Sequence, residues 1–224
     1  NKNNNKNKNN KIKISKKEIV ELVNKLRAQE IISIDLETTS IDPIIAEIVG
    51  VSFSCKPNSG YYIPFQCPGN VIELSDTDIL LILKPLLESD RNKFIGQNIK
   101  YDSLVLRKYN ICLNNIYFDT MIAEYMLHPD KNSYKLDYLS LDYLKYRMVP
   151  IDDLIGTGLH QKSMAEVSLD EISFYACEDA DVAFQLTEIL EKELKKEKLF
   201  QPYIAIENPL IQVLISIEKN GVFL

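Results

Sequence analysis

Hydrophobic positions near the start of the chain recur at the spacing of one helix face. Ser15 and Glu18 form the capping pattern that begins a helix. The apolar residues that follow lie three or four positions apart and predict an amphipathic helix ending near residue 29: Ile19, Leu22, Val23 and Leu26. The same pattern after Ser75 predicts a second capped helix, with Pro85 expected to kink its end.

Short runs rich in β-branched and aromatic residues separate the helical stretches. They predict three neighbouring strands in an antiparallel meander, at residues 31–36, 48–53 and 61–65, and two more strands at 93–96 and 116–118. Helical spacing then predicts helices at residues 99–109, 120–127, 136–144, 169–196 and 201–220. Strands that come mostly before helices indicate an α/β fold with a mixed sheet flanked by helices.

The composition of the 224 residues excludes several classes of protein. Hydrophobic residues make up 46% and charged residues 26%, and no apolar run reaches the roughly 18 residues of a membrane helix. The four cysteines are far apart and only two histidines are present, so the spacings of a structural zinc site are missing. We therefore expect no membrane partner and a reducing intracellular compartment.

Positive charge is concentrated at the start of the chain. Residues 1–17 hold seven lysines and no acid, and residues 1–14 form an Asn/Lys-rich segment expected to be disordered, with a basic nucleic-acid arm as the alternative. The remaining chain carries 19 basic and 32 acidic residues, a net charge of −13. Neutralisation of phosphates alone therefore does not explain nucleic-acid binding here. Metal ions or a neighbouring domain must also hold any nucleic acid.

Two acidic residues lie at the end of the first predicted strand. Asp35 and Glu37 flank Leu36, and because side chains alternate along a strand both carboxylates face the same side. A hydrophobic strand that ends in two acids costs folding energy unless they meet cations. Taken alone, the pair is also explained by a solvated strand end.

Two later segments carry further polar residues at turns and on helix faces. Gln97 and Asn98 lie on the turn before a predicted helix, and Asp102 lies one turn into it. Tyr175 and Asp179 are four residues apart in the long helix, so the phenol and the carboxylate share a face. An N-cap role for Asn98, and chance pairing of Tyr175 with Asp179, remain open when each segment is taken alone.

In this order, on a strand and two helices, these residues resemble the DEDDy group of the DnaQ-like 3′-5′ exonuclease superfamily, which has an RNase H-like fold. Within it they resemble the proofreading exonuclease domain of family A, DNA polymerase I-like enzymes. The similar stretches are IDLETTSID, GQNIKYD, FDTMIAEYML and YACEDAD. The resemblance implies an exonuclease domain over residues 15–200. Because IENPLIQVLISIEKNGV resembles the start of the polymerase domain, residues 201–224 are expected to begin that following domain, truncated here.

The chemistry of phosphodiester hydrolysis suits this set of oxygen ligands. Two divalent ions can stabilise the attacking water, the phosphoryl group and the leaving oxygen, and hard ions such as Mg²⁺ prefer carboxylates. The resemblance implies two Mg²⁺ or Mn²⁺ ions. Asp35, Glu37 and Asp179 would bind the first, Asp35 would bridge to the second, and Asp102 would hold the second through waters. Tyr175 would position the nucleophilic water together with Glu37, rather than act as a base, since a free phenol has a pKa of about 10.

The resemblance also implies contacts with the 3′ end of a DNA strand. Gln97 and Asn98 match the family's contacts to the terminal nucleotides. Ile41 and Ile151 stand where the family places apolar side chains against the last bases, although plain packing is an equal alternative. Where the family often has His or Arg, this chain offers only Lys135 for a phosphate contact.

The function implied by the resemblance is removal of mispaired 3′-terminal nucleotides from single-stranded DNA ends as nucleoside 5′-monophosphates. The chain would be the proofreading part of a DNA polymerase, with the polymerase domain of the same polypeptide as its partner. An RNase D-like RNA exonuclease and a non-catalytic structural module are the alternatives. The Asn, Lys and Ile bias indicates an AT-rich genome and resembles polymerases of a plastid-like organelle, the apicoplast.

Overall fold

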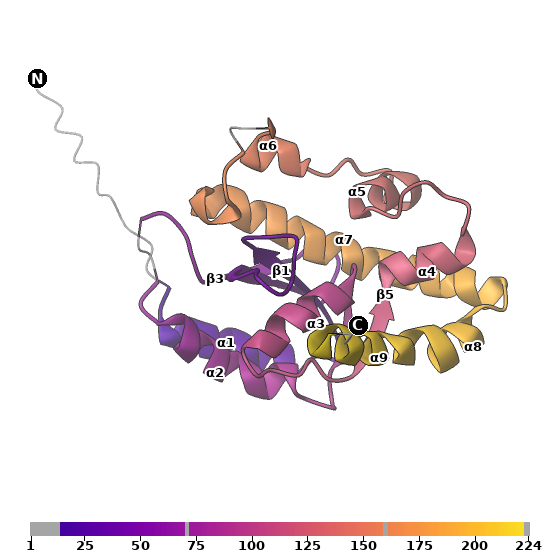
Figure 1. The fold of residues 1–224 in the computed structure, drawn as a ribbon, viewed down its shortest axis with the longest axis horizontal. Helices are drawn as coiled ribbons and strands as arrows, with labels where there is room; N and C mark the ends of the chain where they lie inside the picture. The colour runs from indigo at the N-terminus through magenta and orange to yellow at the C-terminus, as the bar shows by residue number, and fades with distance from the viewer. Residues whose placement is uncertain (1–13, 70–71, 159–160, 222–224) are drawn as a thin grey trace, which may run out of the picture.

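A five-stranded mixed sheet forms the centre of the computed structural model, which describes residues 14–69, 72–158 and 161–221 (Figure 1). Its strands lie in the order β3-β2-β1-β4-β5. Their bounds are β1 Ile31–Thr38, β2 Ile48–Ser54, β3 Tyr61–Pro64, β4 Lys93–Gly96 and β5 Ile116–Asp119. β1, β2 and β3 are antiparallel, and β4 runs parallel to β1 and β5. The predicted α/β fold with a mixed sheet is confirmed, whereas residues 1–13 of the expected disordered segment lie outside the described residues.

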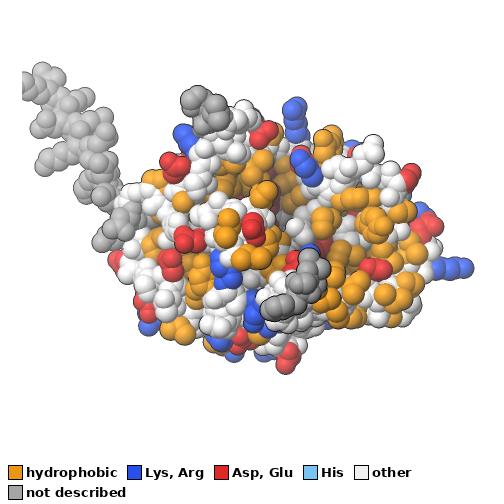
Figure 2. Space-filling model, viewed as in Figure 1, with side chains coloured by type: hydrophobic (Ala, Val, Ile, Leu, Met, Phe, Trp, Pro, Cys, Tyr) orange, Lys and Arg blue, Asp and Glu red, His pale blue; other side chains and the backbone are white. Residues whose placement is uncertain are grey.

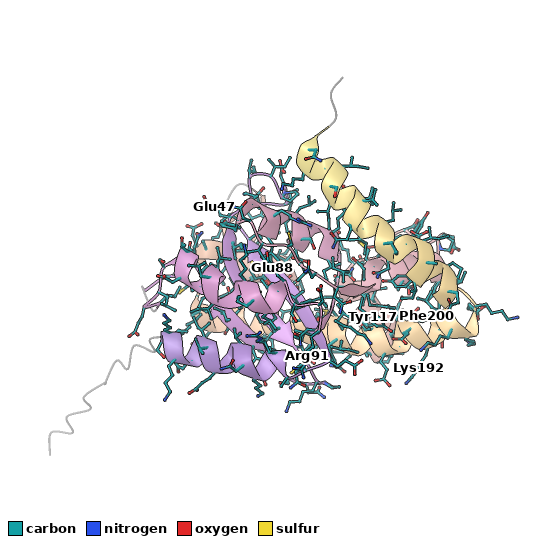
Figure 3. The ribbon with its side chains drawn as sticks, turned by 90° about the horizontal axis from the view of Figure 1, so that it is seen from below. Glu47, Glu88, Arg91, Tyr117, Lys192 and Phe200 are labelled. Carbon is teal, nitrogen blue, oxygen red and sulfur yellow. The ribbon has the colours of Figure 1, made fainter. Side chains whose placement is uncertain are left out.

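Helices cover both faces of this sheet. Their bounds are α1 Lys16–Arg27, α2 Asp76–Leu87, α3 Ile99–Lys108, α4 Thr120–Leu127, α5 Leu136–Leu139, α6 Ile151–Ile155, α7 Leu169–Lys196, α8 Phe200–Pro202 and α9 Asn208–Asn220. The long α7 lies along one face, and α1, α2, α3 and α9 lie on the other (Figures 1 and 3). At the sheet edge, Tyr117 Oη of β5 bonds Glu191 Oε2 of α7 at 3.2 Å. Among the described residues no helix is both long and apolar enough to span a bilayer.

The two faces of β1 differ in polarity. Ile32, Ile34 and Leu36 point into the apolar core formed with α1, α2, α3 and α9. The alternating residues Asp35 and Glu37 point to the face covered by α7. The sheet therefore presents polar side chains to the helix that packs on it, and this is where the acidic residues gather.

Small residues let α7 approach the sheet closely. Ala176, Ala180 and Ala183 recur on its inner face and are fully or almost fully buried. Gly60, in the turn before β3, faces Cys177 so closely that a Cβ at residue 60 would lie 2.5 Å from the Cys177 Cβ. Because the helix lies so close to the sheet, even a short side chain on α7 can reach the end of β1.

The predicted helix at 201–220 is divided in the structure. α8 is followed by a π-helical turn, Tyr203–Glu207, before α9 begins. Pro209, at the start of α9, has no N–H to continue the α-helical bonding. Ile211 and Ile215 on the inner face of α9 are buried against the core under α3. The boundary at residue 200 between two domains stays a prediction.

The other differences between the predicted and the observed helices are local. The helix expected at 136–144 changes to a π-helical turn, Ser140–Leu144, and ends at Lys145, which adopts a left-handed conformation. α2 continues through Pro85 to Leu87. α6 and a 3₁₀ turn, Met164–Glu166, were not predicted, because they are shorter than the window in which helical spacing can be recognised.

One buried carboxylate caps two helices. Asp119, at the end of β5, accepts hydrogen bonds from the backbone N–H groups of Asn98 and Ile99 at the start of α3, at 3.3 and 2.9 Å. It also accepts from Met121 and Ile122 at the start of α4, at 2.9 and 3.2 Å. Helix N-termini need such acceptors. Asp119 therefore fixes the start of the helix that carries Asp102.

We expect Asp119→Ala to lower the free energy of unfolding by about 3 kcal/mol or more, because four backbone N–H groups lose their acceptor. Ser75→Ala, which removes the exposed cap of α2, is the matched control and should cost about 1 kcal/mol. Urea denaturation measures both. Equal losses in the two variants would contradict a double-capping role for Asp119.

Candidate active site

Three carboxylates from two elements meet between the end of β1 and the middle of α7. One oxygen each from Asp35, Glu37 and Asp179 can be chosen so that all three lie within 4.8 Å of one another. Among the described residues no Lys or Arg forms an ion pair with any of them. The structure thus brings together three of the four acids expected to share a site.

Asp102 lies directly beside this cluster. It is buried, and its Oδ1 accepts a hydrogen bond from the N–H of Leu36, between the two acids of β1, at 3.2 Å. Asp35 contributes to raising the pKa of Asp102, which places their charges within interaction range. The fourth acid therefore adjoins the other three, with one oxygen committed to the backbone.

Burial without a cation disfavours ionisation of the whole group. Removal from water raises the pKa of Asp35 to about 6. Burial, followed by repulsion from Asp35, raises the pKa values of Glu37, Asp102 and Asp179 well above the usual range. Glu37 Oε1 is buried and has no hydrogen-bond partner among the residues that the structure describes. Oxygen-only ligands and excess negative charge fit a hard divalent cation.

Tyr175 lies one helical turn before Asp179 on α7. Its phenol and the Asp179 carboxylate lie close enough that each shifts the pKa of the other. Burial and the neighbouring carboxylates hold the pKa of the phenol far above its ordinary value. Tyr175 therefore keeps its proton at neutral pH and has a hydroxyl hydrogen available to donate.

A groove runs past the carboxylates and opens on the face shown in Figure 2. Its widest part, about 740 Å³, lies between the segment after β1 and α6. A second part of about 520 Å³ adjoins it along α3 and is lined by Asp35 and Asp102. Ile41 is 97% exposed and Ile151 is 46% exposed, and both line the groove. Such exposure does not support the packing alternative for these two residues.

Gln97 and Asn98 line the same groove but differ in their contacts. The Gln97 amide donates to the carbonyl of Tyr134 at 2.7 Å and accepts from the Thr120 hydroxyl, so it is engaged within the protein. Asn98 has a φ of 55°, and its side chain makes no capping bond. The N-cap interpretation of its side chain is therefore wrong, because Asp119 provides that cap.

Lys135 and Tyr101 complete the walls of the groove. Lys135 lines a narrower hollow of about 210 Å³ together with Tyr175 and Asp179, as well as the part along α3. The Tyr101 hydroxyl donates a hydrogen bond to the carbonyl of Ser40 and shares one with the hydroxyl of Thr38. These bonds hold the segment after β1 against α3. Sequence reasoning missed Tyr101, although it lies inside the GQNIKYD stretch next to Asp102.

Comparison with known families agrees with this geometry. A family model described as 3′-5′ exonuclease, of the DNA polymerase A type, matches residues 12–195. The chain belongs to this exonuclease family. DNA polymerase I of Borreliella burgdorferi is 37% identical over 211 residues, which is 94% of this chain and 22% of that protein. DNA polymerase I of Pseudomonas aeruginosa is 37% identical over 202 residues, or 88% and 22%. The exonuclease chain thus spans about a fifth of the length of these relatives.

Solved structures show the same fold. The POL domain of Pol1 from M. smegmatis matches with a TM-score of 0.73 at 15% identity, covering 94% of this chain and 32% of that one. Escherichia coli RNase D matches with a TM-score of 0.69 at 14% identity, covering 94% and 50%. At these identities the likeness concerns the fold alone. The expected RNase H-like architecture and the expected 3′-5′ exonuclease family are both confirmed.

In the presence of a metal chelator, the free energy of unfolding of the exonuclease should fall as the pH rises from about 4 to about 6. The pKa of Asp35 rises from 3.8 to about 6 on folding, so the folded state keeps a proton that the unfolded chain has released. The stabilisation from this proton is fully present below pH 3.8, the pKa in the unfolded chain, and is lost above about pH 6, the pKa in the folded state. Urea midpoints across this range should show a shallower fall for Asp35→Asn. Identical profiles would contradict the raised pKa.

Asp179→Asn should stabilise the chelator-treated protein at pH 7.5 by about 1 to 2 kcal/mol, because one of the repelling charges is removed. Asp170→Asn, at an exposed position in the first turn of the same helix, is the control and should change the free energy of unfolding by less than about 0.5 kcal/mol. Urea denaturation gives both values. A loss of stability in Asp179→Asn would show that the acidic cluster is not under repulsion.

Proposed function

We propose that this exonuclease domain binds two divalent ions, Mg²⁺ or Mn²⁺, and hydrolyses the 3′-terminal nucleotide of a DNA strand. The ions would be held by Asp35, Glu37, Asp102 and Asp179, and each turnover would release a nucleoside 5′-monophosphate. The observation that carries the proposal is the meeting of three carboxylates within 4.8 Å, with no Lys or Arg paired to them in the part of the chain that the structure describes. A solved neighbour at 16% identity, NrnC of Brucella melitensis, has bound Mg²⁺.

The side chains around the cluster have complementary tasks. Once bound, the divalent ions would supply an activated water and would neutralise charge on the phosphoryl group and the leaving oxygen. The protonated phenol of Tyr175 donates a hydrogen bond that orients the attacking water, and the Glu37 carboxylate accepts from it. Lys135 is a cationic side chain that lines the groove beside Tyr175 and Asp179, in position to bind a phosphate.

The groove suits an unpaired strand end. Ile41 and Ile151 are exposed apolar side chains on its walls and would contact the faces of the last bases without reading sequence. Asn98 would contact the terminal nucleotide, and Gln97 would act by holding the loop at Tyr134. DNA is favoured over RNA because the relatives with 37% identity are DNA polymerases.

The outer face of α9 supports a partner in the same polypeptide. Exposed apolar side chains follow one stripe of the helix and the turn before it, at Ile206, Leu210, Val213 and Ile217. Figure 2 shows hydrophobic side chains gathered over this region of the molecule. The relatives continue well past the length of this chain and are polymerases. We propose that a following polymerase domain covers this stripe and that the exonuclease serves its proofreading.

We expect the protein to shorten 5′-labelled single-stranded DNA from its 3′ end in Mg²⁺ or Mn²⁺, and to stop in EDTA. Asp35→Asn and Asp179→Asn should each lower the rate by about 100-fold or more. Asp170→Asn should keep the wild-type rate. Denaturing gels and chromatography of released mononucleotides measure this. Metal-independent cleavage, or full activity in Asp35→Asn, would overturn the proposal.

The same assay separates the alternatives. A matching RNA oligonucleotide that is degraded faster than the DNA would favour an RNase D-like enzyme. Absence of any shortening by a folded sample that binds no Mn²⁺ would favour a structural module.

A further inference from the structure

Three neighbouring strands present one continuous face to α7 near Glu37. Glu37 of β1 pairs with Gly50 of β2, and Gly50 pairs with Pro64 of β3. Tyr62, two positions before Pro64, therefore points to the same face as Gly50 and Glu37. Tyr62 itself pairs with Ser52, so it lies diagonally across the sheet from Gly50, on the face that carries Glu37.

The ring of Tyr62 crosses the middle strand at Gly50. A Cβ at residue 50 would lie 2.1 Å from the Tyr62 hydroxyl oxygen and 2.3 Å from its Cζ. No side chain other than hydrogen fits there, so the missing side chain of Gly50 is what admits the ring. The hydroxyl end of Tyr62 thus lies over β2, at the residue that pairs directly with Glu37.

Two buried oxygens on this face near Gly50 have no hydrogen-bond partner among the described residues. One is the Tyr62 hydroxyl, and the other is Glu37 Oε1. Buried polar atoms are rarely left unpaired without a functional reason. Burial and then the charge of Glu37 raise the pKa of Tyr62 far above its ordinary value, so its hydroxyl keeps the proton it would donate. A donor on β3 and an acceptor on β1 therefore face each other across β2, and neither has a hydrogen-bond partner in the described part of the chain.

We propose that Tyr62 is a positioning residue whose hydroxyl donates a hydrogen bond to the Glu37 carboxylate, directly or through one water, and fixes the orientation in which Glu37 acts. The inference rests on the proposed function, because Glu37 acts there as a metal ligand and water acceptor. Tyr175 approaches the cluster from α7, and Tyr62 approaches it from the sheet. A role in packing alone would be served equally well by phenylalanine.

The test is Tyr62→Phe, which keeps the ring and removes the hydroxyl. Tyr61→Phe is the matched control, because the neighbouring hydroxyl bonds Lys25 Nζ at the surface, at 2.5 Å. We expect Tyr62→Phe to weaken Mn²⁺ binding about 5-fold to 10-fold, measured by electron paramagnetic resonance of free Mn²⁺. The kcat on single-stranded DNA should fall about 10-fold to 100-fold with KM unchanged. The melting temperature in EDTA should not fall, since an unpaired buried hydroxyl is lost.

The inference would be overturned if the Tyr62→Phe and Tyr61→Phe variants had the same Mn²⁺ affinity and the same kcat, provided that the wild type binds Mn²⁺ and cleaves DNA. A wild type that does neither would overturn the proposed function itself, and the inference with it. A second comparison uses Glu37→Gln. If Tyr62 acts through Glu37, Tyr62→Phe adds little further loss of Mn²⁺ affinity in that background, whereas a full additional loss would assign Tyr62 to another group.

Discussion

Repulsion among carboxylates is the constraint on which this architecture depends. Asp35, Glu37, Asp102 and Asp179 are held together without a basic partner among the described residues. Such an arrangement costs stability in the metal-free chain. The surrounding fold must therefore be rigid enough to keep the acids together, and the apolar core on the other face of β1 and the close packing of α7 provide that rigidity.

The scaffold fixes each acid by a different device. β1 places two of them on one face by strand alternation, and α7 places Asp179 opposite them by a close approach over alanines. Asp102 depends on the start of α3, which is capped by Asp119 rather than by its own first residue. The site thus depends both on the local geometry of single strands and helices and on a long-range contact, the cap that Asp119 of β5 makes on α3.

This division explains what the sequence could predict. The five strands, α1 and α7 follow from spacing and capping residues, and the pairing of Asp35 with Glu37 follows from alternation. The meeting of Asp179 with these acids needed the family resemblance, because period and propensity do not determine which helix lies over which strand. The caps made by Asp119, the engagement of Gln97 with Tyr134 and the crossing of Tyr62 over Gly50 depend on tertiary contacts between segments distant in sequence.

The three alanines of α7 set the spacing between helix and sheet, and this gives them a use in comparing relatives. A bulkier residue at 176, 180 or 183 would push the helix outward and carry Asp179 away from β1, even in a chain that retains every acidic ligand. A diverged homologue can therefore lose activity through substitutions at apolar positions alone. An inventory of carboxylates alone would count such a homologue as competent.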